Sequence, residues 1–519
     1  MNQEKTNTQV KSTLGLTGVT VNAMALIAPG AFLWITYQMQ AAATAPSGAS
    51  VASDIWSGIV FALILAFLTA LSYAELARIY PEAGFGSSYY FAEKAFLDRE
   101  NTQHHRWARL AKLVTGWAAH LFYWVYPGVM VAMMAILIGY IFTAFTGYTM
   151  TNTELTVIAV AFAAVVGYIA YRGVTGSTLT AFIINVVQLI SLIGFSIAAI
   201  IYRLHNPAHA ATWAFSSAWD VVKIHSIQGV LIQSTIAILI LVGFESSTAF
   251  AAEAKNPKRD IPRAVIISLI IQGLFAYLFE YFAAGYMVNE KLINTAVNGA
   301  VSTTVTGLAA AGASSAPMGD MSILLGNTLL RGIGFGLMIT IAITVALAIL
   351  GTTLSCMNTA VRVSYAMAQD KEMPNILNAL HGRFATPHRA IWVLVIVSSL
   401  IAAIGVRSVV GLTGITLASN FGTFVLYGLT CLWTIVAFAE HKQFNTIKHI
   451  VIPVLGLIAN LAMLGAILYL YIIGNSDAKH EAYICFAIAG IWAIASAVYV
   501  LVSSRKAGRP IIGLQYKGQ

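Results

Sequence analysis

The sequence predicts an all-α integral membrane protein with twelve transmembrane helices. Three observations support this fold class. Apolar residues make up 58% of the 519 positions and charged residues only 9%, whereas a soluble domain carries about 25% charged residues. Runs of Leu, Ile, Val, Ala and Phe recur at lengths that exceed the ~20 residues needed to cross a bilayer as a helix. Lys and Arg gather in alternate segments between these runs, as they do in multi-pass membrane proteins.

The apolar runs define the predicted spans in chain order. Their ranges are 14–41, 55–78, 113–145, 154–171, 175–202, 226–252, 262–288, 328–366, 389–407, 411–439, 448–474 and 482–504. The first and eighth exceed one crossing, which indicates tilt, a break or an extension beyond the bilayer. We therefore divide the chain into an N-terminal tail, a ten-span core, a final pair of spans and a C-terminal tail, over 1–13, 14–439, 440–504 and 505–519.

The basic side chains predict the orientation of the chain. If the N-terminus is cytoplasmic, 23 of the 29 Lys and Arg residues fall in inner segments and six in outer segments. This distribution follows the positive-inside rule, so we expect a plasma-membrane protein with both termini in the cytoplasm. The net charge of +9 then follows from topology, and no nucleic-acid partner is expected.

Two connecting segments are more than simple loops. Residues 84–112 combine aromatic side chains with a basic patch that includes His104 and His105, which predicts an amphipathic helix on the inner surface of the bilayer. Residues 289–325 are rich in Ala, Gly, Ser and Thr, and they form either an outer lid or a flexible connection. The three cysteines all fall in apolar runs, where they are expected to be buried without a metal or a disulfide.

Pro29 and Gly30 lie near the middle of the first predicted span. Proline lacks a backbone donor and obstructs the preceding helical turn, while glycine accepts non-helical angles. The pair predicts either an unwound joint or an ordinary proline kink, which membrane helices tolerate. An unwound joint would expose backbone donors for a carboxylate and carbonyl acceptors for an ammonium.

The sixth predicted span carries a second interruption at Gly243, followed by the carboxylate of Glu245. Hydrocarbon solvates neither free backbone groups nor a charge, so such a segment is expected to line a polar cavity. Two helices broken at corresponding positions of two five-span blocks are typical of a carrier's binding site. Glu245 is expected to carry a proton or to act as an inner-gate group.

Three motifs give the chain a family resemblance. They are Gly243-Phe244-Glu245 with Ala252-Glu253-Ala254-Lys255-Asn256-Pro257-Lys258-Arg259-Asp260-Ile261-Pro262-Arg263-Ala264, then Tyr73-Ala74-Glu75-Leu76-Ala77 with Tyr80-Pro81-Glu82-Ala83-Gly84, and Tyr365-Ala366-Met367-Ala368-Gln369-Asp370 with Met373-Pro374. On these motifs the chain resembles the amino acid–polyamine–organocation superfamily, in its amino-acid permease branch. The resemblance covers spans one to ten. It implies a LeuT-type 5+5 inverted repeat with discontinuous helices 1 and 6, and alternating access to a central site.

The resemblance also implies a set of substrate-binding residues. They would be Ala28, Pro29, Gly30, Ala31, Tyr126, Val242, Gly243, Phe244, Glu245 and Cys356. Backbone donors of the first joint would hold a substrate carboxylate, and carbonyls of spans one and six its α-amine. The family commonly reads Gly-Ser-Gly at this joint, where the present chain reads Ala28-Pro29-Gly30.

Several residues are candidates for coupling or gating. Proton-linked members of the family often carry a lysine in span five, where this chain holds Gln188. Coupling is therefore expected to use another group such as Glu245, or Na⁺ bound near Thr352, Thr353 and Ser355, or solute exchange without an ion. Two further residues at membrane depth have more than one interpretation each. His120 either titrates or packs. Glu280 pairs with a tyrosine, marks the outer vestibule or contacts substrate.

Taken with the resemblance, the residues predict a secondary active transporter, a symporter or antiporter, of an amino acid or related amine. The alternative is a polyamine or amine carrier, or a substrate:product antiporter. An ion channel would need a continuous polar pore, which we do not find. No catalytic constellation, phosphate-binding glycine loop or paired-histidine metal motif is present in the sequence, so we expect neither an enzyme nor a cofactor. The expected partners are a small-molecule solute, the lipid bilayer and a coupling ion, H⁺ or Na⁺.

Overall fold

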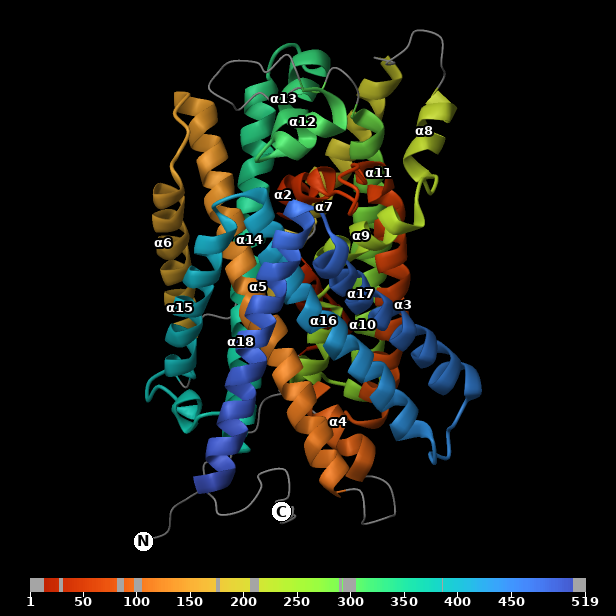
Figure 1. Cartoon of the computed structure of the whole chain (residues 1–519), viewed down its shortest axis with the longest axis vertical. Coiled ribbons are helices and arrows are strands. Elements are labelled where there is room, and N and C mark those ends of the chain that lie inside the picture. Colours follow the sequence, from red (N-terminus) through yellow and green to blue (C-terminus); the bar gives the residue numbers. More distant parts are fainter. Residues whose placement is uncertain are drawn as a thin grey trace.

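A computed structural model describes residues 14–27, 31–81, 88–97, 105–173, 178–205, 214–288, 292, 305–384 and 386–506. Within these ranges the chain is helical, with two isolated β-bridges and no β-sheet. The helices are packed side by side, most of them along the long axis of the molecule (Figure 1). Eleven of them are long and apolar enough to cross a membrane.

From the second predicted span onward the helices follow the predicted order, with ends that differ from the predicted bounds by up to eight residues. Those of the first half are α3 (Ile55–Ile79), α5 (His105–Thr146), α6 (Asn152–Tyr171), α7 (Thr178–His205), α9 (Ile227–Ala237), α10 (Pro257–Leu269) and α11 (Leu278–Met287). A π-helical segment over Ile270–Tyr277 joins α10 to α11. The second half contains α14 (Gly334–Gln369), α15 (His388–Gly405), α16 (Val409–Phe438), α17 (Ile452–Ile473) and α18 (Ser476–Lys506).

The first predicted span consists of two shorter helices, α1 (Leu16–Ile27) and α2 (Ala31–Ala42). Each is 12 residues long, which is too short to cross a bilayer alone. The predicted joint at residues 28–30 lies between them and outside the described residues.

α5 packs against several other helices, namely α4 (Ser88–Leu97), α6, α14, α15 and α16. Its 42 residues include Pro127, and its middle section is almost entirely buried. Close packing depends on small residues on both sides. A Cβ at Gly422 of α16 would lie 2.8 Å from the backbone nitrogen of Phe122 in α5.

The prediction of a surface helix over 84–112 is wrong for the described part of that segment. Residues Ser88–Leu97 form α4, whose Tyr89, Phe91 and Glu93 are buried because the helix packs against α5 and α16. Residues from His105 onward already belong to α5. Amphipathic character therefore marked a helix that covers other helices, at the lower end of the bundle (Figure 1).

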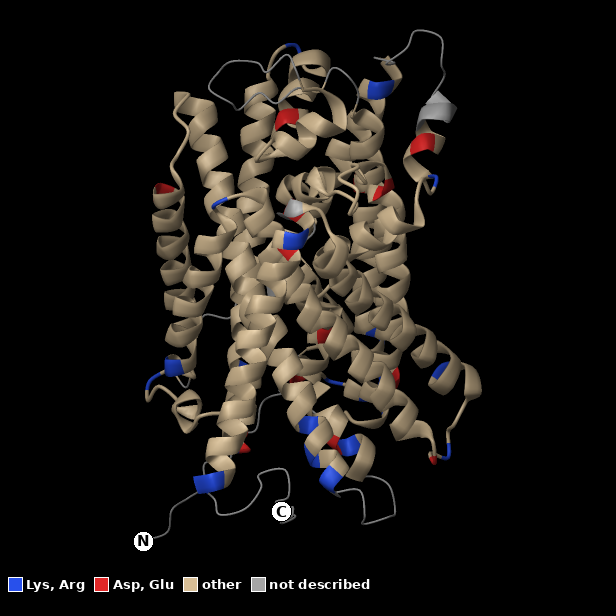
Figure 2. Ribbon diagram, in the orientation of Figure 1, with Lys and Arg blue, Asp and Glu red and all other residues tan. Residues whose placement is uncertain are grey.

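The segment predicted as an outer lid or connection is partly helical. α12 (Gly307–Ala313) and α13 (Pro317–Leu329) lie at the opposite end of the molecule from α4 (Figure 1). Both pack on α2, and α13 also packs on α14. Among the described residues, Lys and Arg are most numerous toward the end where α4 lies (Figure 2).

Candidate functional site

The sixth predicted span is interrupted at Gly243, as the sequence predicts. α9 ends at Ala237, a short 3₁₀ segment follows over Ile238–Ile240, and a second one runs over Phe244–Glu253. Gly243 has φ +123°, a conformation that favours glycine. A Cβ there would lie 3.0 Å from the backbone nitrogen of Ile27, so the interruption approaches the end of α1 at backbone distance.

Glu245 stabilises this interruption through three hydrogen bonds. The Tyr123 hydroxyl donates to Oε1 at 3.0 Å, the Tyr427 hydroxyl donates to Oε2 at 2.7 Å, and the Gly243 N–H donates to Oε2 at 2.9 Å. The carboxyl group is fully buried, and no Lys, Arg or His pairs with it among the described residues. Glu245 thereby ties α5 and α16 to the break.

The residues after Glu245 explain the tight 3₁₀ geometry. The hydroxyls of Ser246, Ser247 and Thr248 each donate to the carbonyl three residues earlier, at 2.6, 2.7 and 2.6 Å. Such local bonds compete with regular α-helical bonding, and the spacing of three residues is that of a 3₁₀ helix.

The carbonyls at the end of α1 are held by side chains from other helices. The Tyr277 hydroxyl donates to the carbonyl of Ile27 at 2.9 Å, Gln272 donates to Met24 at 2.8 Å, and Thr352 donates to Ala25 at 3.2 Å. A helix terminus leaves its last carbonyls without intrahelical partners. The end of α1 therefore places several polar backbone carbonyls inside an otherwise apolar helix bundle. Of the substrate residues implied here, Ala28, Pro29 and Gly30 lie outside the described residues, and Ala31 opens α2.

The remaining implied substrate residues gather around the break. Phe244 packs edge-on against Tyr73 and tilted against Tyr427, with ring centroids 6.1 and 5.3 Å apart. The Cys356 thiol contacts the Tyr123 carbonyl at 3.6 Å. Val242 and Tyr126 are buried as well. The Tyr126 hydroxyl has no hydrogen-bond partner within the described part of the chain.

Sequence reasoning missed Tyr427 and gave Tyr123 no bond to Glu245. These tyrosines lie 182 and 122 residues from Glu245 in the sequence. No motif or spacing connects them, so only the packing of α5 and α16 brings them together.

The other candidates occupy different parts of the bundle. His120 is buried between the Trp124 and Trp492 rings, with centroids 4.4 and 4.8 Å away, and neither ring nitrogen has a hydrogen-bond partner among the described residues. The imidazole thus packs against two indole rings and has no polar partner among the described residues. The Thr353 hydroxyl donates to the Ile349 carbonyl of its own helix at 2.6 Å.

Gln188 and Ser355 line one cavity of about 280 Å³ between α1, α7 and α14. Asn22, Asn185, Asn358 and Arg362 also line this cavity. Leu347, Leu350 and Leu354 are among its apolar lining residues. The cavity brings together the coupling candidates of the fifth and eighth predicted spans. No cluster of three His, Cys, Asp or Glu residues that could hold a metal occurs in the described ranges.

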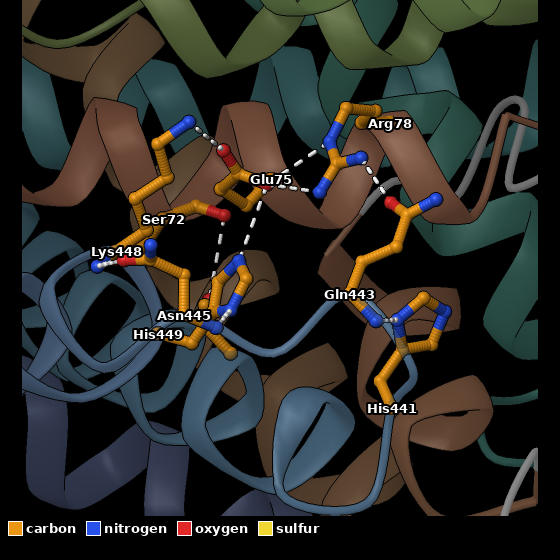
Figure 3. Close-up of polar contacts among 9 residues, drawn as sticks. Ser72, Glu75, Arg78, His441, Gln443, Asn445, Lys448 and His449 are labelled. Carbon is orange, nitrogen blue, oxygen red and sulfur yellow. Dashed lines mark hydrogen bonds and ion pairs between the residues drawn. The ribbon is translucent and has the colours of Figure 1, made fainter.

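Two charged clusters lie toward the α4 end of the bundle. In Figure 3 the Glu75 carboxylate of α3 faces Arg78, Lys448 and His449, at 2.6, 3.8 and 3.4 Å. This cluster joins α3 to the π-helical segment Ile447–Val451 that precedes α17.

The second cluster joins α4, α5 and the end of α14. The buried Lys112 ammonium lies 2.7 Å from Glu93 and 2.8 Å from Asp370. The Tyr89 hydroxyl lies 2.9 Å from both Asp370 and Glu372. Burial raises the pKa of Glu372 to about 7, despite the opposing effect of Arg109 and Lys112.

Comparison with known proteins matches this architecture to one family. The sequence profile described as amino acid permease matches residues 12–502. The chain belongs to the amino acid permease family. Members of this family are membrane transporters and not enzymes, and the long apolar helices make the present chain a multi-pass membrane protein.

Individual relatives are distant. The chain is 23% identical over 282 residues to the branched-chain amino acid permease BcaP of Bacillus subtilis (strain 168), covering 53% of this chain and 50% of that protein. It is 22% identical over 230 residues to the methylthioribose transporter of the same organism, covering 43% and 42%. An uncharacterized transporter of Rhizobium meliloti (strain 1021) is 25% identical over 217 residues, covering 42% and 41%. The chain spans half or less of the length of each relative.

Proposed function

We propose that this protein is a secondary active transporter that moves an amino acid or a related amine across the plasma membrane by alternating access. The observation that carries the proposal is the interruption at Gly243, held open by Glu245 and facing the end of α1. The family membership supports it. The named relatives, one for branched-chain amino acids and one for methylthioribose, make a small polar solute reasonable here too.

The proposed site lies between the α1–α2 junction and the Gly243 break, in a LeuT-type arrangement of two inverted repeats. A broken helix at membrane depth offers unpaired backbone groups and oriented half-helix dipoles. Such groups bind the carboxylate and amine of a zwitterion without needing a charged side chain. Tyr126, Phe244 and Cys356 would surround the rest of the solute.

Solute counterflow into proteoliposomes tests the proposal. The panel should include neutral, acidic and basic amino acids and a diamine, with and without gradients of H⁺ and Na⁺. We expect saturable exchange of at least one amino acid or amine. Saturable countertransport is also what distinguishes a carrier from a channel. If no member of the panel exchanges, the proposed substrate class is wrong.

Gly243→Val tests the site itself. Valine cannot easily adopt φ +123° and would collide with Ile27, so uptake should fall by at least about tenfold while insertion into the membrane persists. Gly465→Val is a matched control, because a Cβ at Gly465 in α17 meets nothing within 4 Å. Wild-type uptake by Gly243→Val would remove the break from the binding site.

Glu245 is not our candidate for ion coupling. It accepts three hydrogen bonds that hold the break in place, which favours a structural role for its carboxyl group over proton transfer. A Na⁺ ion near Thr352 and Ser355, or exchange without an ion, remain the other two schemes, and the same gradient measurements distinguish them.

A further inference from the structure

Glu280 is the one buried carboxyl group without a hydrogen-bond or ion-pair partner among the described residues. It is fully buried in α11, and neither of its oxygens has a partner. Each of the other buried acidic side chains has one. They are Asp54 with Ser57 and the His225 N–H, Glu93 with Lys112, Glu245 with Tyr123, Tyr427 and Gly243, Asp260 with Arg259, Asp320 with Tyr140, and Glu372 with Tyr89.

Tyrosines lie beside Glu280, and no basic side chain in the described ranges pairs with it. Tyr277, the last residue of the π-helical segment, and Tyr281 in α11 interact with it electrostatically. Tyr281 in turn packs against Tyr37 of α2, with ring centroids 5.7 Å apart. From α7, which packs on α11, the nearest cation is Arg203, whose guanidinium lies over the Tyr286 ring at 5.9 Å.

Glu280 also lies next to the proposed solute site. Tyr277, one helical turn away, donates to the Ile27 carbonyl at the end of α1. The hydroxyl groups of Tyr281 and Tyr126 have no hydrogen-bond partners among the described residues. A cation at Glu280 would therefore find one carboxylate and, beside it, the Tyr281 hydroxyl oxygen, which has no partner among the described residues.

A cavity near Glu280 provides room for a solute on the side away from α4. It measures about 180 Å³ and is lined by Tyr37, Trp56, Arg203, Asp220, Tyr281 and Tyr286, among others. Tyr281, which follows Glu280 in α11 and interacts with it electrostatically, is therefore also part of the wall of this cavity.

We propose that Glu280 binds a positively charged group of the transported solute, so that the substrate is a basic amino acid or a diamine. A carboxyl group at membrane depth that lacks a counter-charge is stable only when a cation or a proton neutralises it. An ammonium group supplies that charge and three N–H donors, and the flanking tyrosine rings favour a cation as well. This inference rests on the proposed function and narrows its substrate class.

Lysine and norleucine make the sharpest pair of probes, because they share the α-amino acid group and differ at the ammonium. Binding to the purified full-length chain is measured by thermal shift and calorimetry, with 1,4-diaminobutane as a third probe. We expect lysine or the diamine to bind roughly 10- to 100-fold more tightly than norleucine, as a buried charged hydrogen bond would give. Glu280→Gln should remove this difference and leave norleucine binding unchanged.

Glu481→Gln is the matched control, because it makes the same change in a different helix. Glu481 lies in α18, which packs on α16, α17 and α5. The control variant should keep the preference for the cationic solute. If Glu280→Gln fails to fold, Glu280→Asp withdraws the charge by one methylene and should reduce the preference.

The outcomes separate the two proposals. Equal binding of lysine and norleucine by the wild-type chain, with no binding of the diamine, would overturn the role of Glu280 and leave an amino-acid carrier in place. An unchanged preference in Glu280→Gln would overturn it too. Failure of all probes to bind or exchange would instead count against the proposed function.

Discussion

Glu245 and Glu280 are both fully buried glutamates beside tyrosines in spanning segments, yet their hydrogen bonding differs. Glu245 accepts three hydrogen bonds and holds a broken helix in place, whereas Glu280 accepts none from the described residues and lies among tyrosines. A carboxyl group at membrane depth can therefore have different roles, which depend on its hydrogen-bond partners. A satisfied carboxylate stabilises the fold, and an unsatisfied one retains the capacity to bind something.

The same substitution at both positions should give opposite results and the largest effect. Glutamine at 245 offers one acceptor oxygen in place of two, so at least one of the three donors loses its partner. We expect Glu245→Gln to lower the stability of the protein by about 2–4 kcal/mol and its apparent melting temperature by several degrees. Glu280→Gln loses no bond and should leave the melting temperature unchanged or higher. Equal destabilisation by both variants would contradict the claim that Glu245 stabilises the fold through its hydrogen bonds and Glu280 does not.

Glu372 is a third buried glutamate, and it lies outside the spanning segments. Its neighbours are the cations Arg109 and Lys112 and the Tyr89 hydroxyl. Its pKa is raised from 4.5 to about 7, chiefly by burial. The folded state therefore holds a proton that the unfolded state loses above pH 4.5. Its stabilising contribution is complete below that pH and is lost as pH rises through 7, by about 3 kcal/mol at most.

Thermal unfolding measured from pH 5 to pH 8 checks this dependence. Glu372→Gln removes the titrating group, keeps an acceptor oxygen for the Tyr89 hydroxyl, and should flatten the fall in melting temperature across that range. Glu440→Gln, at an exposed position after α16, should retain the wild-type slope. A Glu372→Gln profile as steep as that of the wild type would show that another group causes the fall.

Two tyrosine-to-phenylalanine changes should give the smallest contrast. Tyr427→Phe removes the 2.7 Å bond to Glu245 and should cost about 1–2 kcal/mol. The Tyr281 hydroxyl has no partner among the described residues, so Tyr281→Phe should cost almost nothing. The melting temperatures of the two variants measure this difference in stability. A larger loss for Tyr281→Phe would contradict the claim that the Tyr281 hydroxyl makes no hydrogen bond to the described residues.

Much of the fold could be predicted from the sequence because long apolar runs have few alternatives in a membrane protein. α15 and α17 end within two residues of the predicted bounds. The interruption at Gly243 could be predicted because only glycine adopts its backbone angles without strain. The surface assignment of α4 failed because an apolar helix face looks the same whether lipid or protein covers it.

The site could be predicted only where the information is local. Glu245 stands out because a charge within an apolar run is rare. Tyr427 does not stand out, because it is one of 22 tyrosines in the sequence. It becomes a hydrogen-bond donor to Glu245 only when α16 packs beside the break. The contrast between Glu245 and Glu280 depends on which donors reach each carboxyl group, and such long-range contacts leave no pattern in a single sequence.

The Lys112 ammonium, shared by Glu93 and Asp370 across three helical segments, constrains how this chain can evolve. Loss of the lysine alone would leave two acids facing each other in a buried space, and loss of either acid would leave the cation underbalanced. Successful descendants should therefore exchange these three positions as a group, so that an aligned set of close homologues would show them varying together rather than one by one.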